Sequence, residues 1–372
     1  MKTMTKLAIT MLLVLLLFGC KSSEETTSIG VISALTQHGA DWGTEEKNAI
    51  ELAVAEINIA GGIDGKQIKL IVEDSGTDPT KTITAYKKLT EVNGIKFIVG
   101  PTWEASTAAI APLAAKENVL LISPSAYKNI QNQNSSHLFS TYPPYYYEIR
   151  GLIPFFEEHN MTRFVIIYHN EYFSELMKNF FVNEAEQNNW TISKTLARDV
   201  EDRDYRTSLL QLKNLNIDAI YAPLAVDDPD LGLLMKQMRE LGINATVVSA
   251  SSAENVNLLK NFATEIEGII YPYPVETPAY SSFAEKYKQK YGELPHTPSA
   301  ATAYDATTLL IDALKSGAET PEKVAKYLHN ITDYQGASNV INFDEQGVIS
   351  SKEHFVKTVK NGEFVEIEKT SE

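Results

Sequence analysis

The chain has 372 residues, of which 44% are hydrophobic and 22% are charged, and its formal net charge is −15. The composition is typical of a globular protein, and the length exceeds what one core packs well, so two lobes are expected. The acidic balance, with no basic cluster to offset it, argues against nucleic-acid binding, because phosphate backbones would be repelled.

The chain begins with a basic stretch and a short apolar run, residues 7–18, which ends just before Gly19 and Cys20, the only cysteine. This pattern is typical of a secretory signal peptide, here residues 1–19. A cysteine at this place resembles a bacterial lipobox, which implies that the Cys20 thiol carries lipid. The alternative, a transmembrane helix, needs about 20 apolar residues. We therefore expect an exported chain without disulfides, held by lipid through a polar tether, residues 20–27, on the outer face of the cytoplasmic membrane or in the periplasm.

After the tether, short β-branched runs alternate with longer amphipathic segments. The first series is strand 29–35, helix 44–59, strand 68–73, helix 81–91, strand 95–99, helix 106–117 and strand 119–122. The second is helix 145–159, strand 164–168, helix 174–187, strand 191–196, helix 205–215, strand 219–222, helix 231–241 and strand 246–249. This alternation predicts an α/β fold with parallel sheets that helices cover on both faces.

Two proline-containing stretches, residues 141–144 and 271–274, interrupt these series. Proline lacks a backbone donor, so both stretches are expected to be poor interiors of a strand or helix. The remaining elements are helices 280–291, 299–316 and 321–330, a strand pair 337–343 and 354–360, and a last strand 364–367 after an Asn-Gly turn. Parallel sheets bind ligands at the carboxyl ends of their strands, so two facing lobes predict a cleft that closes on a small molecule.

Several short segments carry a family resemblance through their order and spacing. They are Ile-Gly-Val-Ile-Ser-Ala-Leu-Thr at 29–36, Ala-Glu-Ile-Asn-Ile-Ala-Gly-Gly-Ile at 55–63, Val-Glu-Asp-Ser-Gly-Thr-Asp-Pro at 72–79, Val-Gly-Pro at 99–101, Ile-Ser-Pro-Ser-Ala at 122–126 and Ala-Tyr-Asp-Ala at 303–306. In this succession the chain resembles the type I periplasmic binding proteins of the leucine/isoleucine/valine-binding family. The resemblance implies two doubly wound parallel-sheet lobes joined by three hinge strands: residues 28–141 plus 276–333, and residues 142–275 plus 334–368.

The resemblance also implies that the chain, as a monomer, delivers a captured small molecule to the permease subunits of an ABC transporter. A ligand sensor of the same fold, signalling to a partner receptor, is the alternative, and the lack of a fused signalling domain favours transport. An enzyme is not expected, because the chain has no Gly-x-Ser-x-Gly or His-Glu-x-x-His motif and its histidines show no metal-ligand spacing. No cofactor or metal is expected.

The positions that bind the ligand in amino-acid-binding relatives are altered here. The resemblance places Glu104 where those relatives use a small hydroxyl residue for the ligand carboxylate, which a second carboxylate would repel. Their next loop corresponds to Ser125, Ala126 and Tyr127, with tyrosine in place of a threonine. The neutral Ser251 lies near the position of their acid for the α-ammonium. Both charge partners of a zwitterionic ligand are therefore altered.

The remaining candidates follow the carboxyl ends of expected strands: Trp42, Trp103, Tyr172, Phe173 and Asp227, next to Asp228. The polar surroundings of Trp42 and Trp103 favour a pocket wall over core packing. Tyr172 and Phe173 fit either environment, and for Asp227 a solvated loop is favoured. Glu104 has the alternative of only complementing a helix dipole. Aromatic walls beside Glu104, with no evident cation for a carboxylate, indicate a neutral or cationic ligand.

Overall fold

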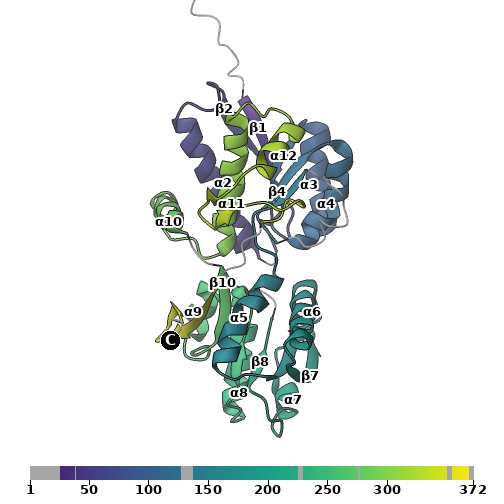
Figure 1. Cartoon of the computed structure of the whole chain (residues 1–372), viewed down its shortest axis with the longest axis vertical. Helices are drawn as coiled ribbons and strands as arrows, with labels where there is room; N and C mark the ends of the chain where they lie inside the picture. The colour runs from purple at the N-terminus through teal and green to yellow at the C-terminus, as the bar shows by residue number, and fades with distance from the viewer. Residues whose placement is uncertain are drawn as a thin grey trace, which may run out of the picture.

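The chain folds into two α/β lobes, which lie one above the other in Figure 1. The computed structural model describes residues 26–37, 39–126, 137–224, 229–274, 277–349 and 354–367. Cys20, Tyr127 and Asp227, together with the expected signal and most of the tether, lie outside these residues. Within them, no helix has the length and hydrophobicity needed to cross a membrane.

The first lobe is built on a parallel sheet whose described strands lie in the order β2-β1-β3-β4-β5. These strands are β1 (Thr26–Ser33), β2 (Gln67–Asp74), β3 (Phe97–Val99), β4 (Leu120–Ser123) and β5 (Leu138–Ser140). Its helices are α2 (Ala40–Ile59), α3 (Pro79–Lys87) with a π-helical continuation η1 (Lys88–Val92), α4 (Glu104–Glu117), α10 (Pro278–Tyr291), α11 (Pro298–Lys315) and α12 (Pro321–His329).

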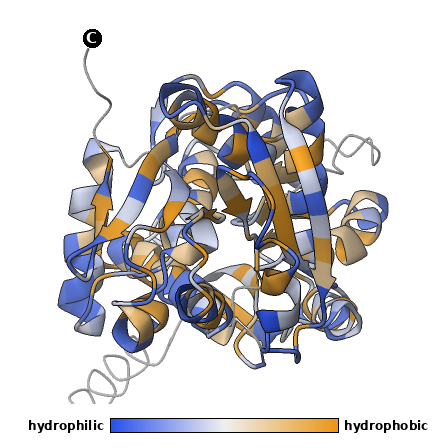
Figure 2. Cartoon of the chain, turned by 90° about the horizontal axis from the view of Figure 1, so that it is seen from below, coloured by the Kyte–Doolittle hydropathy of each residue, from blue (hydrophilic) through white to orange (hydrophobic). Residues whose placement is uncertain are grey.

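Successive strand residues of this lobe enter different cores, one on each face of the sheet. Val31 and Val99 pack in one apolar cluster with α2 and α11, while their neighbours Ile32 and Ile98 pack in another with α3 and α4. Side chains alternate between the two faces of a strand, so a strand that is apolar throughout needs a helical layer on both sides. Figure 2 shows hydrophobic residues along the interior strands and hydrophilic residues on outward-facing helical turns.

The second lobe has a larger mixed sheet, in the order β14-β13-β10-β9-β8-β6-β7. The parallel strands are β6 (Arg163–His169), β7 (Thr191–Arg198), β8 (Ala219–Tyr221), β9 (Thr246–Val248) and β10 (Ile270–Pro274). At one edge, β13 (His354–Lys360) and β14 (Glu363–Glu366) run antiparallel. The helices are α5 (Tyr146–Glu158), α6 (Tyr172–Gln187), α7 (Arg206–Leu210), α8 (Asp230–Glu240), a 3-10 turn η3 (Ser251–Ala253) and α9 (Val256–Phe262).

The α/β class and the two parallel-sheet lobes predicted from the sequence are confirmed. Local signals explain the starts of several helices. Asp78 caps α3 by accepting a hydrogen bond from the backbone N–H of Thr80 at 2.6 Å, and Pro79 occupies the first helical position. Thr320 and Pro321 begin α12 in the same way. The expected helix 205–215 is shorter, because α7 ends at Leu210 and irregular turns follow.

The last part of the chain differs from the expectation in two respects. The segment expected as a strand at 337–343 does not pair with β13; β11 (Tyr334–Gln335) and β12 (Val340–Ile341) form a small hairpin instead. Ala337, Ile341 and Ile349 lie in the apolar core of the first lobe. The expected boundary at residue 334 therefore differs from the structure, because these apolar side chains are buried against the first lobe and the passage to the second lobe comes after residue 349.

The prolines near residue 272 lie within a strand, contrary to the sequence-based expectation of a break. Pro272 and Pro274 are both in β10, opposite Val356 and His354 of β13. They are two residues apart, so their nitrogens, which have no hydrogen, point to the same side of the strand. That side faces β9, which pairs with β10 only at Ile270. The missing donors therefore leave few ladder bonds unmade.

Candidate functional site

A cavity of about 400 Å³ lies between the two lobes. The first lobe lines it with residues that follow β1, β2 and β3: Gly39, Trp42, Thr77, Trp103, Glu104 and Ala105. The second lobe lines it with Tyr145 and with residues that follow β6, β7 and β9: Glu171, Tyr172, Phe173, Val200, Glu201, Ser251 and Ser252. Each lobe therefore offers the carboxyl ends of its strands, the place where parallel α/β sheets bind ligands. The volume suits a small molecule.

Two tryptophans form the first-lobe wall of this cavity. The ring centroids of Trp42, in the first turn of α2, and Trp103, just before α4, are 5.6 Å apart with a tilt of 39°. Gly39 makes room for this pair. A Cβ added to Gly39 would lie 2.3 Å from Cζ2 of Trp103, and the φ of +69° at Gly39 is in the left-handed region that glycine tolerates. The backbone at Gly39 therefore sets how closely Trp103 can pack.

We expect Gly39→Ala to displace the Trp103 ring and to lower stability by about 1–2 kcal/mol through backbone strain alone. Gly242→Ala is a matched control, since Gly242 has a φ of +68° and nothing within 4 Å of an added Cβ. Near-ultraviolet circular dichroism and urea unfolding of both variants separate the two effects. Only the Gly39 variant should change the tryptophan signal, and identical spectra for the two variants would contradict the packing described above.

The second-lobe wall is also aromatic. The rings of Tyr145 and Phe173 meet edge to face, with centroids 5.4 Å apart. Glu171 caps α6 by accepting hydrogen bonds from the backbone N–H groups of Phe173 at 2.8 Å and Ser174 at 2.6 Å. This cap holds the start of the helix, and with it Phe173 and Tyr172, at the rim of the cavity. Tyr172 is 49% exposed at this rim.

Three buried carboxyl groups influence the Tyr145 hydroxyl electrostatically. Glu104 lies in the first turn of α4 and is 5% exposed, while Glu46 and Glu148 are fully buried. Burial raises the pKa of the Tyr145 hydroxyl well above its usual value, and the charges of Tyr142, Glu104, Glu148 and Glu46 raise it further. The Tyr145 hydroxyl therefore keeps its proton at neutral pH.

Glu148 holds Ser251 in place across the inside of the second lobe. The Ser251 hydroxyl donates to Oε1 of Glu148 at 2.7 Å, and the Ser251 backbone N–H donates to Oε2 at 3.0 Å. The Tyr142 hydroxyl lies 3.4 Å from Oγ of Ser251. Burial raises the pKa of Glu148 to about 7, although the bonds from Ser251 and Tyr142 favour the ionised form. Because the Ser251 hydroxyl hydrogen is used by Glu148, Ser251 presents lone pairs to a ligand.

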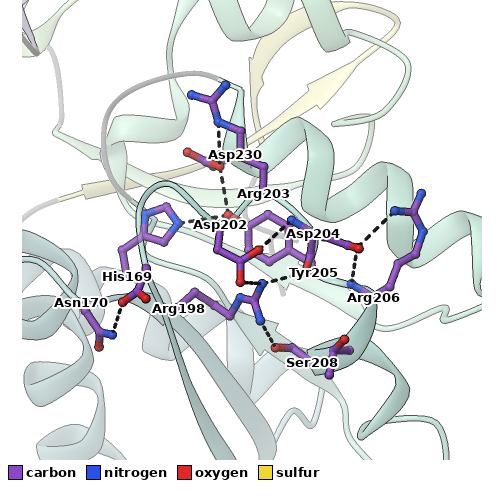
Figure 3. Close-up of polar contacts among 12 residues, drawn as sticks. His169, Asn170, Arg198, Asp202, Arg203, Asp204, Tyr205, Arg206, Ser208 and Asp230 are labelled. Atoms are coloured by element: carbon purple, nitrogen blue, oxygen red, sulfur yellow. Dashed lines mark hydrogen bonds and ion pairs between the residues drawn. The ribbon is translucent and has the colours of Figure 1, made fainter.

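A polar network fixes the loop that carries Val200 and Glu201 (Figure 3). Buried His169, at the end of β6, lies with Nε2 3.0 Å from the hydroxyl of Tyr205, which donates to Oδ1 of Asp230 at 3.1 Å. Arg198, at the end of β7, forms an ion pair with Asp202. Bonds at both ends of the loop therefore limit its movement and present Val200 and Glu201 to the cavity.

Six of the site residues expected from the sequence line this cavity together: Trp42, Trp103, Glu104, Tyr172, Phe173 and Ser251. Two others, Ser125 and Ala126, are buried and are not among the lining residues that the structure describes. The hydroxyl of Ser125 lies 3.0 Å from that of Ser123, and its carbonyl accepts a bond from Ser140 at 2.7 Å. Tyr127 and Asp227 lie outside the described residues.

Sequence reasoning missed several lining residues, of which Tyr145 and Glu171 are the most informative. Tyr145 follows two prolines that indicate a break, and a hinge beside the cleft is a signal that its neighbours face the ligand. Glu171 directly precedes Tyr172, but glutamate is not among the usual N-cap residues, so the sequence did not indicate its cap. The contact between Glu148 and Ser251 joins residues 103 positions apart, so no local pattern could have indicated it.

The comparisons with known proteins agree with this architecture. Residues 26–363 match the family model described as "Periplasmic binding protein". The chain is 23% identical to the leucine-, isoleucine-, valine-, threonine- and alanine-binding protein of Pseudomonas aeruginosa, over 87% of each chain. It is also 23% identical to the Leu/Ile/Val-binding protein of Escherichia coli K12, over 89% of this chain and 90% of the relative.

Solved structures of other binding proteins have the same fold as this chain. The branched-chain amino acid transporter substrate binding protein LivJ of Streptococcus pneumoniae, in complex with isoleucine, superposes with a TM-score of 0.80 and 25% identity. That match covers 92% of this chain and all of the other. The leucine binding protein LivK of Thermotoga maritima superposes with a TM-score of 0.81 and 23% identity, over 92% of this chain and 98% of that one.

These relatives are binding proteins rather than enzymes, in agreement with the expectation from the sequence. The family is extracytoplasmic, which agrees with an exported chain. The matched segment spans nearly all of the described residues, including both lobes and the cavity between them. The chain therefore belongs to the periplasmic binding protein family.

Proposed function

We propose that this chain is the solute-binding component of an ABC transporter, which captures a small polar molecule, amino-acid or amide-like, and delivers it to the permease. The observation that carries this proposal is the cavity of about 400 Å³ whose lining comes from the strand ends of both lobes. The names of the relatives and of the solved structures, which include a transporter substrate binding protein, support the same role. A lipid on Cys20 would keep the protein at the membrane, where a permease can meet it.

The geometry supports a mechanism of capture by lobe closure. Judged by the described residues on either side, the chain passes between the lobes three times: after β5, after β10 and before β13. A ligand that contacts Trp103 of one lobe and Tyr145 of the other is bound more tightly when the lobes approach each other. Such differential affinity shifts the population toward the closed form, which a permease can recognise.

The cavity lining favours a neutral or cationic solute over the zwitterionic amino acids named for the relatives. None of the described lining residues is lysine, arginine or histidine, and three are glutamates. A ligand carboxylate would lose its hydration without gaining a cationic partner from these residues, which is costly in a closed site. An amide or amine has donors that the glutamates and the Ser251 lone pairs can accept.

Differential scanning fluorimetry with a panel of amino acids, amides, polyamines and nucleosides tests this function. A ligand that binds only the folded chain at 100 times its Kd adds about 2.7 kcal/mol of stability, which should raise Tm by several degrees. Small-angle X-ray scattering should show a smaller radius of gyration with the same ligand. A panel in which no class shifts Tm, at concentrations well above the micromolar range, would contradict solute capture.

A further inference from the structure

The walls of the cavity pair one aromatic cluster from each lobe. The Trp42–Trp103 pair comes from the first lobe, and the Tyr145–Phe173 pair comes from the second, with partly exposed Tyr172 beside it. Aromatic faces carry negative potential and attract cations, most strongly when water is excluded. A cation between the two pairs would contact both lobes at once, so its binding would be coupled to closure.

Among the residues that the structure describes, the charged groups lining the cavity are all acidic. Glu104 is buried in its wall, and Glu171 and Glu201 also line it, while no described lining residue is basic. Glu104 lies in the first turn of α4, where its carboxylate complements the positive end of the helix dipole. A ligand carboxylate would have to compete with Glu104 for that same helix end and would be repelled by it.

The second lobe offers acceptors in place of donors. Because the hydroxyl and backbone N–H of Ser251 both donate to Glu148, the polar group that Ser251 presents is a hydroxyl oxygen polarised by a carboxyl group. An ammonium group can donate to that oxygen and to Glu104. A carboxylate finds no charged donor on the described residues of either wall.

From these features we infer that the physiological ligand is a small organic cation, an amine or quaternary ammonium compound without a carboxylate. This inference rests on the proposed function and, of the neutral and cationic solutes that the lining favours, selects the cations. The aromatic pairs surround the cationic head, Glu104 supplies the opposite charge, and lobe closure completes the enclosure. In this arrangement the positive charge of the ligand contributes more to its affinity than the shape of its apolar part does.

Two sets of probes separate charge from shape in isothermal titration calorimetry. Choline and 3,3-dimethyl-1-butanol differ by nitrogen against carbon, so only choline is charged. Isopentylamine, L-leucinamide and L-leucine share a branched apolar end, but L-leucine alone has a carboxylate. We expect the cations to bind at least tenfold more tightly than 3,3-dimethyl-1-butanol and L-leucine. Tighter binding of L-leucine or of the neutral alcohol than of every cation would overturn the inference and leave solute capture intact.

Variants of one carboxylate test the source of this selectivity. Glu104→Gln keeps the shape and removes the charge, so cation affinity should fall about 10- to 100-fold while the affinity for the neutral alcohol stays within threefold. Glu175→Gln is the control, because Glu175 is exposed in the first turn of α6 and is not a lining residue. Circular dichroism checks that both variants fold.

Equal cation affinity in wild type and Glu104→Gln would overturn the role of Glu104 as counter-charge, and with it this inference. If no probe and no member of the fluorimetry panel binds, the proposed function fails as well.

Discussion

Replacing Asp305 with alanine is expected to lower the free energy of unfolding by about 3 kcal/mol or more. Asp305 lies buried on α11 and accepts hydrogen bonds from the backbone N–H of Ala337 at 2.6 Å, the backbone N–H of Ser338 at 2.7 Å and the Ser338 hydroxyl at 2.5 Å. Alanine would leave two buried backbone donors without an acceptor, at about 1–3 kcal/mol each. Urea unfolding at pH 7.5 measures this loss.

The segment that Asp305 holds is also tied to the lobe connections. The Thr277 hydroxyl, at the start of α10, donates to the carbonyl of Gly336 at 2.6 Å. Thr277 follows the second passage between the lobes, and the Gly336 segment precedes the third. Asp305→Asn is the matched control, because its amide oxygen keeps one acceptor, and it should fall between wild type and alanine. An alanine variant within 0.5 kcal/mol of wild type would contradict this anchoring role.

The sequence predicts the two lobes well because the relevant signals are local. Alternating strand and helix periods determine the layers, and caps such as Asp78 and Thr320 mark helix starts. The end of the chain is different. Whether Ala337 and Ile341 join one lobe or the other depends on which distant surface buries them. The strand around Pro272 likewise depends on where β9 stops, which no property of residues 271–274 reveals.

The candidate site likewise contains residues that the sequence predicts and residues that only the fold reveals. Trp42, Trp103 and Phe173 can be expected at the cavity because each follows the carboxyl end of a strand, a rule that needs no tertiary information. Glu148 lies within an amphipathic helix, and its partner Ser251 is far along the chain. In a sequence, a glutamate that will be buried cannot be distinguished from one that lies on the surface. The burial of Glu148, and the raised pKa that follows from it, are properties of the fold alone.

Glu46 is the buried carboxyl group whose removal should most change the pH dependence of stability. It is fully buried on α2, and neither of its oxygens has a hydrogen-bond partner among the described residues. Burial raises its pKa from 4.5 to about 8, and the nearby Thr102 and Ser299 hydroxyls offset this only in part. Between pH 4.5 and 8 the folded chain keeps a proton at Glu46 that the unfolded chain releases, so the stability present below pH 4.5 is lost as pH rises. The loss by pH 9 is about 3–5 kcal/mol.

Glu46→Gln should remove this part of the pH dependence, because glutamine has no proton to release. We expect similar stabilities for the variant and wild type near pH 5, where Glu46 is protonated, and a more stable variant at pH 9, by about 3 kcal/mol or more. Glu148 titrates in both proteins with a pKa of about 7, so its contribution cancels in the difference. Urea unfolding at pH 5, 7 and 9 measures the free energy of unfolding of each protein.

Glu51→Gln, on the same helix but paired with Lys47 and half-buried, should change stability by less than about 1 kcal/mol at every pH. Parallel curves for wild type and Glu46→Gln would show that folding does not raise the pKa of Glu46, and would contradict this prediction.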